Sequence, residues 1–122
     1  MRGLIASAPA VVAAFVLAAC GPTPPQAPLH EAKTLNDTTS NISTACGEAY
    51  QLRAFPPAPH HLMTTLEATA SSAAEKLAGV YRRNPAWIYQ GETIGQIVSD
   101  TDAMLGSCGL TGAQHALRRA TR

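Results

Sequence analysis

Apolar residues recur every three or four positions through most of the chain after residue 34. This spacing gathers them on one face of an α-helix, whereas a strand would need strict alternation. The apolar runs predict three helices, over residues 35–53, 62–81 and 94–108, and a capping signal adds a short fourth over residues 111–119. The expected fold is therefore all-α, a small antiparallel bundle of three to four helices.

Chain breakers and capping residues set the limits of these helices. The proline-rich segment 55–59 and the Asn84-Pro85 pair interrupt the pattern, because proline cannot donate to the helical hydrogen-bond ladder. Gly109 suits the left-handed position that follows many helices. Thr111 and Gln114 have the spacing of a capping box, which predicts the start of the short last helix.

A β-hairpin is a competing interpretation of residues 87–98. Trp87-Ile88-Tyr89 and the segment 93–98 are rich in strand-forming residues, and Gln90-Gly91-Glu92 between them is typical of a turn. The apolar positions from Ile94 to Leu105, however, follow the helical period and break a period of two. The pattern favours the helix after residue 94.

The first 19 residues have the organisation of an export signal. One arginine, Arg2, precedes an uncharged apolar run from Leu4 to Ala19. An uncleaved transmembrane anchor is the alternative. The run has only 16 residues and contains Pro9, whereas a membrane span needs about 20 apolar residues.

The end of this run, Leu17-Ala18-Ala19-Cys20, resembles the lipobox of bacterial lipoproteins. The resemblance implies cleavage before Cys20 and acylation of Cys20, whose thiol carries a thioether-linked diacylglycerol with acyl chains such as palmitate. It also implies a location on the outer face of the cell membrane in a Gram-positive host. Because Gly21 follows the cysteine, it implies the outer membrane, facing the periplasm, in a Gram-negative host. A conventional signal peptide that leaves Cys20 free is the alternative.

Residues 20–33 are expected to form the acylated cysteine and a proline-rich tether, and residues 34–122 the helical domain. Four prolines between Gly21 and Pro28 favour an extended spacer. The whole chain carries 9 Lys and Arg against 8 Asp and Glu. Such a balanced charge argues against nucleic acid as a partner, because nucleic-acid-binding proteins usually present a clearly basic face.

Two cysteines, Cys46 and Cys108, remain once Cys20 carries lipid. An even number of cysteines in an oxidising compartment predicts a disulfide, and both fall on apolar helix faces. Two buried reduced thiols are the alternative. We predict no metal site, because zinc needs a close ligand pair and the adjacent His60 and His61 would point about 100° apart on a helix.

No catalytic constellation is visible in the sequence, so we expect neither an enzyme nor a cofactor. The only close acidic pair, Asp100 and Asp102, would point to different sides of a helix, and we interpret it as part of a solvated face. The sequence contains neither the Gly-x-Ser-x-Gly elbow of hydrolases nor a phosphate-binding loop.

The loop between the second and third predicted helices gathers Arg82, Arg83, Trp87 and Tyr89, residue types that carry binding energy at protein interfaces. We predict that they contact a partner. Alternatively, Trp87 closes the end of the bundle beside Phe55. The expected function is a membrane-anchored envelope lipoprotein that binds another envelope protein as a non-catalytic accessory module. A structural spacer is the first alternative, and a small-ligand carrier or hydrolase is the least favoured.

Overall fold

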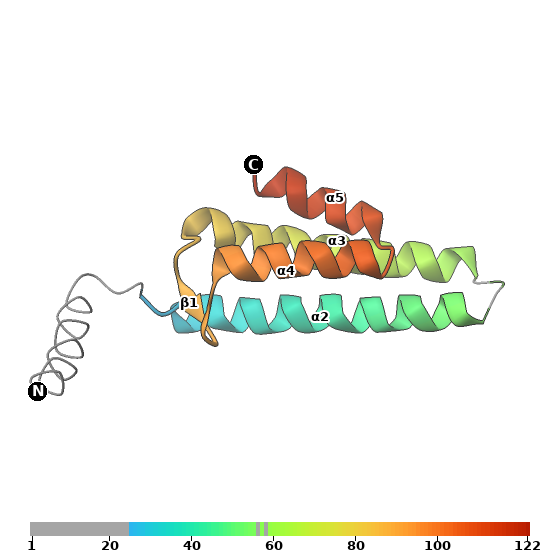
Figure 1. Cartoon of the computed structure of the whole chain (residues 1–122), viewed down its shortest axis with the longest axis horizontal. Helices are drawn as coiled ribbons and strands as arrows, with labels where there is room; N and C mark the ends of the chain where they lie inside the picture. Colours follow the sequence, from blue (N-terminus) through green and yellow to red (C-terminus); the bar gives the residue numbers. More distant parts are fainter. Residues whose placement is uncertain (1–24, 56, 58) are drawn as a thin grey trace, which may run out of the picture.

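The computed structural model describes residues 25–55, 57 and 59–122. The predicted signal peptide, the lipobox and Cys20 therefore lie outside the described residues. The described chain is mostly helical, with four helices and one pair of short antiparallel strands (Figure 1). The elements are α2 (Leu29–Ala54), α3 (His60–Arg83), β1 (Ile88–Tyr89), β2 (Glu92–Thr93), α4 (Ile94–Ser107) and α5 (Thr111–Ala120).

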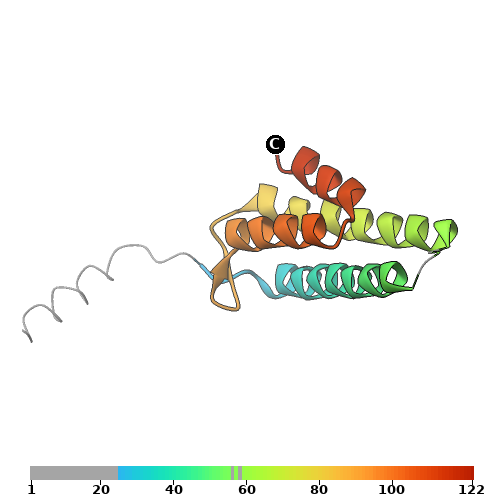
Figure 2. The same cartoon turned by 45° about the vertical axis from the view of Figure 1, so that its right-hand side comes forward.

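Two long helices form the frame of the molecule. Helices α2 and α3, of 26 and 24 residues, run antiparallel beside each other, and α4 and α5 are much shorter. Turning the molecule shows that both long helices extend beyond α4 at the end where they are joined to each other (Figure 2). Residues 25–28, the described part of the predicted tether before α2, enter at the opposite end beside the strand pair, and we call this the tether end (Figure 1).

The hairpin and the helix that competed for residues 87–98 both form, over different residues. Ile88 pairs with Thr93 and Tyr89 with Glu92. Both turn residues between the strands, Gln90 and Gly91, have positive φ of 50° and 83°, as the tightest hairpin turn requires. Helix α4 begins immediately afterwards at Ile94, where the apolar period predicted it.

Helix α2 begins at Leu29, six residues before the predicted start, so residues 29–33 are helical rather than part of the tether. The preceding residues form a short extended segment against the hairpin. Ala27 donates its N–H to the carbonyl of Ile88 at 2.8 Å, and Ile88 donates to the carbonyl of Pro25 at 3.0 Å. The apolar pattern does not extend into the first turn of α2, because Leu29, where the helix begins, is exposed.

Helix capping differs from the prediction at α5 and matches it at Gly109. Thr111 makes no capping hydrogen bond; instead the Glu67 carboxylate of α3 accepts the Gly112 N–H at 2.7 Å. A complete capping box is found at α4, where Thr93 and Gln96 bond each other's backbone N–H groups. Gly109, which follows α4, has φ of 79° and fills the left-handed position as predicted.

The core is made mainly of small side chains. Of the 19 buried apolar residues described, eight are alanines, and the large ones include Leu35, Leu77, Leu105 and Leu117. Alanine lets helices approach closely but removes little apolar surface from water. A thin core of this kind leaves more of the stability to cross-links and polar contacts. No helix among the described residues is long and apolar enough to span a bilayer.

Candidate functional site

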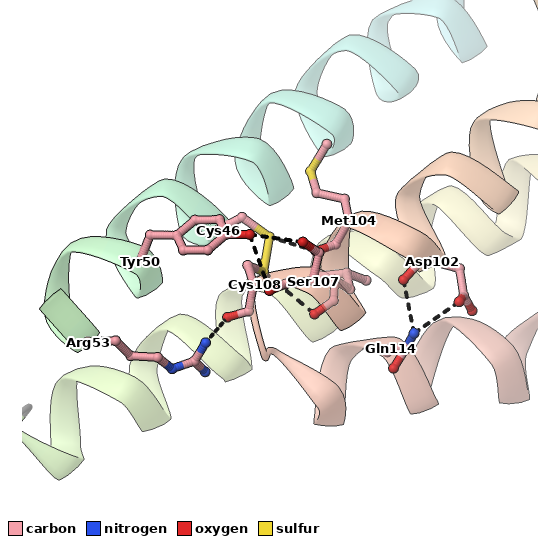
Figure 3. Close-up of a disulfide and its surroundings, with 9 residues drawn as sticks. Cys46, Tyr50, Arg53, Asp102, Met104, Ser107, Cys108 and Gln114 are labelled. Atoms are coloured by element: carbon pink, nitrogen blue, oxygen red, sulfur yellow. Dashed lines mark hydrogen bonds between the residues drawn. A yellow bond between two sulfur atoms is a disulfide. The ribbon is translucent and has the colours of Figure 1, made fainter.

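The two cysteines paired from the sequence meet at the junction of α2 and α4 (Figure 3). The Sγ atoms of Cys46 and Cys108 lie 2.18 Å apart and their Cα atoms 5.4 Å apart, the separations of a disulfide. Both residues are buried. The cross-link joins positions 62 residues apart, so it encloses α3, the hairpin and α4 in one covalent loop.

Two further side chains of α2 hold the end of α4 next to this disulfide (Figure 3). The Tyr50 hydroxyl contacts the Ser107 hydroxyl at 2.9 Å, and the Arg53 guanidinium donates to the carbonyl of Cys108. A Cβ atom at Gly109 would displace that guanidinium, and the φ of 79° at this position favours glycine. The disulfide is therefore the centre of a larger polar junction.

An ion pair closes the tether end of the bundle. Arg83, at the end of α3, forks onto the Glu31 carboxylate in the first turn of α2, with the Nη2 to Oε1 distance at 2.8 Å. The hydrogen bond from Arg83 lowers the pKa of Glu31, and Glu31 in turn raises the pKa of Arg83. Glu31 is buried although it is charged. One of the predicted binding residues thus has a structural contact.

The other predicted binding residues are also engaged within the fold. Arg82 donates a hydrogen bond to the carbonyl of Ala120 at the end of α5. Trp87 and Tyr89 are half-buried and pack against the core at the tether end. Trp87 does not lie beside Phe55, which follows the opposite end of α2 and is 78% exposed. The alternative that Trp87 closes an end of the bundle matches its packing against the core at the tether end. The expected neighbour Phe55 was wrong.

Asp102 connects α4 to α5. Its carboxylate accepts two hydrogen bonds from Arg118, at 2.7 and 2.9 Å, and one from Gln114 at 3.0 Å. The bond from Arg118 lowers the pKa of Asp102. The expectation of a solvated acidic face was wrong for this half-buried residue, although Asp100 is exposed. No spacing rule joins positions 16 residues apart across a loop, so this pair could not be predicted from the pattern of residues.

Apolar side chains are exposed where α2 and α3 extend beyond α4. We call Phe55 and Leu62 the apolar apex; their exposed fractions are 78% and 40%. Leu29, at the tether end, is also exposed. Exposed apolar groups that gather at one end of a small domain are typical of a contact surface.

The side of α2 and α3 that faces away from α4 is grooved. One hollow, of about 610 Å³, is lined mostly by small and polar residues: Thr34, Asp37, Asn41, Thr69, Ser72 and Lys76 among them. A second, of about 310 Å³, lies nearer the apex between Glu48, Leu52, Leu62 and Leu66. We call the two hollows together the α2–α3 groove. Its residues were not singled out in the sequence, because hydroxyl-bearing positions on a helix are normally solvated.

No group of three or more His, Cys, Asp or Glu side chains within the described residues is arranged to hold a metal ion. No family model matches the chain, and neither the curated proteins nor the solved structures that were compared contain a match.

Proposed function

We propose that this chain is an exported bacterial lipoprotein, acylated at Cys20, that carries its helical domain at a membrane surface and binds another envelope protein as a non-catalytic accessory module. The observation that carries the proposal is the Leu17-Ala18-Ala19-Cys20 lipobox at the end of an uncharged apolar run. Two or three acyl chains, at about 0.8 kcal/mol for each buried methylene, would make attachment stable. In a Gram-negative host the domain would face the periplasm.

The disulfide and the tether support this location. A buried cysteine pair at bonding distance suits an oxidising compartment outside the cytoplasm. Pro25, where the extended segment against the hairpin begins, is the fifth residue after Cys20. At a maximum of about 3.5 Å per residue, the leash reaches roughly 17 Å. The domain would therefore stay close to the bilayer, with the hairpin end nearest the lipid.

The apolar apex favours a binding role over that of a spacer. A spacer has no use for large apolar side chains exposed at one end, since each costs solubility without adding stability. Phe55 is aromatic, and aromatic side chains are enriched in the buried centres of protein interfaces. The apex lies at the end of the bundle opposite the tether, so it would be presented away from the membrane.

Metabolic labelling with a fatty-acid analogue tests the anchor. The wild-type chain should incorporate label and partition with membranes, and Cys20→Ser should do neither. Equal labelling of both proteins would refute acylation at Cys20. Ala18→Asp, which puts a charge where the signal peptidase needs a small residue, should reduce processing while leaving the thiol in place.

Cross-linking in whole cells tests the binding role. Phe55→Ser should abolish a specific cross-linked complex without changing the melting temperature, because the side chain is largely exposed. The matched control is Leu29→Ser, an equally exposed apolar residue at the tether end, which should leave the complex intact. Loss of the complex in neither variant would favour the spacer.

A further inference from the structure

The α2–α3 groove lies on the face of the two long helices opposite the face that α4 covers. Helix α4 is held against α2 through Cys46 and Tyr50, whereas Asp37 and Glu48 line the groove. Glu48 and Tyr50 are two residues apart and hence point about 200° apart around the helix. The hollows therefore lie on the side of the α2–α3 pair that no other described element covers.

We propose that a second copy of this chain occupies the groove, related to the first by a two-fold axis parallel to the long helices. Because α2 and α3 are antiparallel, this axis sets α2 of each copy against α3 of the other. The result is an antiparallel four-helix arrangement, which is a common way of burying helix faces. The height of each residue along the bundle is unchanged by the rotation, so equal levels meet.

The charges of the groove are complementary under this operation. Asp37 on α2 and Lys76 on α3 line the same hollow from opposite sides. The rotation brings Asp37 of one copy to Lys76 of its partner, and the reverse pair forms by symmetry. Asp37 also holds Lys33 of its own helix at 3.1 Å, which orients its carboxylate but leaves acceptor positions for a second cation.

The remaining side chains also match like with like. Near the apex, Leu52, Leu62 and Leu66 of one copy would meet the same apolar level of the other. In the middle, Ser72 and its small neighbours permit close approach of the helices. A two-fold axis perpendicular to the long helices would instead set these leucines of one copy against Asp37 and Lys76 of the other.

The available area is sufficient for a stable contact. A helix of 26 residues is about 39 Å long, and two helices about 10 Å apart present a face about 20 Å wide, so each copy could bury roughly 780 Å². Specific protein interfaces bury about 800 Å² on each partner.

The same axis leaves both tethers at one end of the dimer. Two chains anchored in one bilayer could form this dimer, whereas the perpendicular axis would send the anchors in opposite directions. This step rests on the proposed acylation of Cys20. Confinement to one membrane would also raise the effective concentration of each copy for the other.

Charge reversal tests the pairing. The mature acylated chain is studied by sedimentation equilibrium in a density-matched detergent, with its mass measured on the same sample. Wild type should be dimeric, and Asp37→Lys or Lys76→Asp should each weaken the dimer about tenfold, because two attractive contacts become repulsive. The double variant restores both pairs and should return to wild-type affinity. A monomeric wild type, or a double variant weaker than either single one, would overturn the proposal.

A bulky substitution separates the groove from the rest of the surface. Ser72→Trp should give monomers, and the control Ser99→Trp, at an exposed position on α4, should remain dimeric. Dimers that persist in Ser72→Trp would show that a different surface is used. The mass measurement keeps the two proposals apart: a dimer of unacylated chains refutes the anchor alone, and an acylated monomer refutes the dimer alone.

Discussion

Breaking the Cys46–Cys108 cross-link should remove a large part of the stability of the domain. The bond joins positions 62 residues apart. In the chain-entropy treatment, a loop of that length lowers the entropy of the unfolded chain enough to contribute about 4 kcal/mol at 25 °C. Typical domains have a total of about 5 to 15 kcal/mol, and an alanine-rich core argues for the lower part of that range. The expected drop in melting temperature is about 20 °C.

Urea unfolding followed by circular dichroism measures this effect without a mutation, because the same protein can be compared oxidised and reduced. The Cys46→Ala, Cys108→Ala double variant should match the reduced protein to within about 1 kcal/mol, the extra cost coming from the lost sulfur atoms. Ser107→Ala is the control for a change at the same helix end. Mass spectrometry without reductant should find no alkylatable thiol at either cysteine. Free thiols at both, or oxidised and reduced chains that unfold at the same urea concentration, would refute the reasoning.

Two further predictions concern the tether end and the pH dependence of stability. Trp87→Ala should lower the free energy of unfolding by about 2 kcal/mol and the melting temperature by about 10 °C, since half of a large aromatic surface is buried. Phe55→Ala, at an exposed position, should change neither quantity. A Trp87→Ala protein as stable as the wild type would contradict the packing role. The pKa values of Glu31 and Asp102 are lowered in the fold by their arginine partners, so the unfolded chain takes up protons first as pH falls, and the free energy of unfolding should decrease from about pH 5 downward. Glu31→Gln should lose less than about 1 kcal/mol at pH 7 and show a weaker decrease towards pH 3, and an unchanged pH profile would argue that the Arg83 contact does not persist in solution.

Hydrophobic periodicity predicted the helices well because each has a continuous apolar face. The start of α4 at Ile94 and the left-handed Gly109 were predicted to the residue, and the cysteines were paired correctly by their positions on apolar faces. The start of α2 was missed because its first turn is stabilised by the ion pair of Glu31 rather than by apolar burial.

The contacts between elements could not be predicted from local spacing. Glu67 caps α5 from another helix, and that cap replaces the Thr111 box that the sequence favoured. Asp102 is half-buried because Arg118 lies opposite it only after α5 has folded back. Arg83 was assigned to a binding surface for the same reason, since its partner Glu31 is 52 residues away. Each of these errors concerns a polar side chain whose partner is distant in sequence.

The extended segment that precedes α2 determines how many residues lie between Cys20 and the folded domain. Two backbone hydrogen bonds with Ile88 hold residues 25–28 against the domain. While they are intact, the docked segment begins at Pro25, the fifth residue after Cys20. A pull on the domain loads these two bonds before it loads any helix, and after their release the folded part begins at Leu29, the ninth residue after Cys20. The maximum reach from Cys20 then rises from about 17 to about 31 Å. Under the proposed acylation of Cys20, this extension would let the domain move away from the bilayer without unfolding.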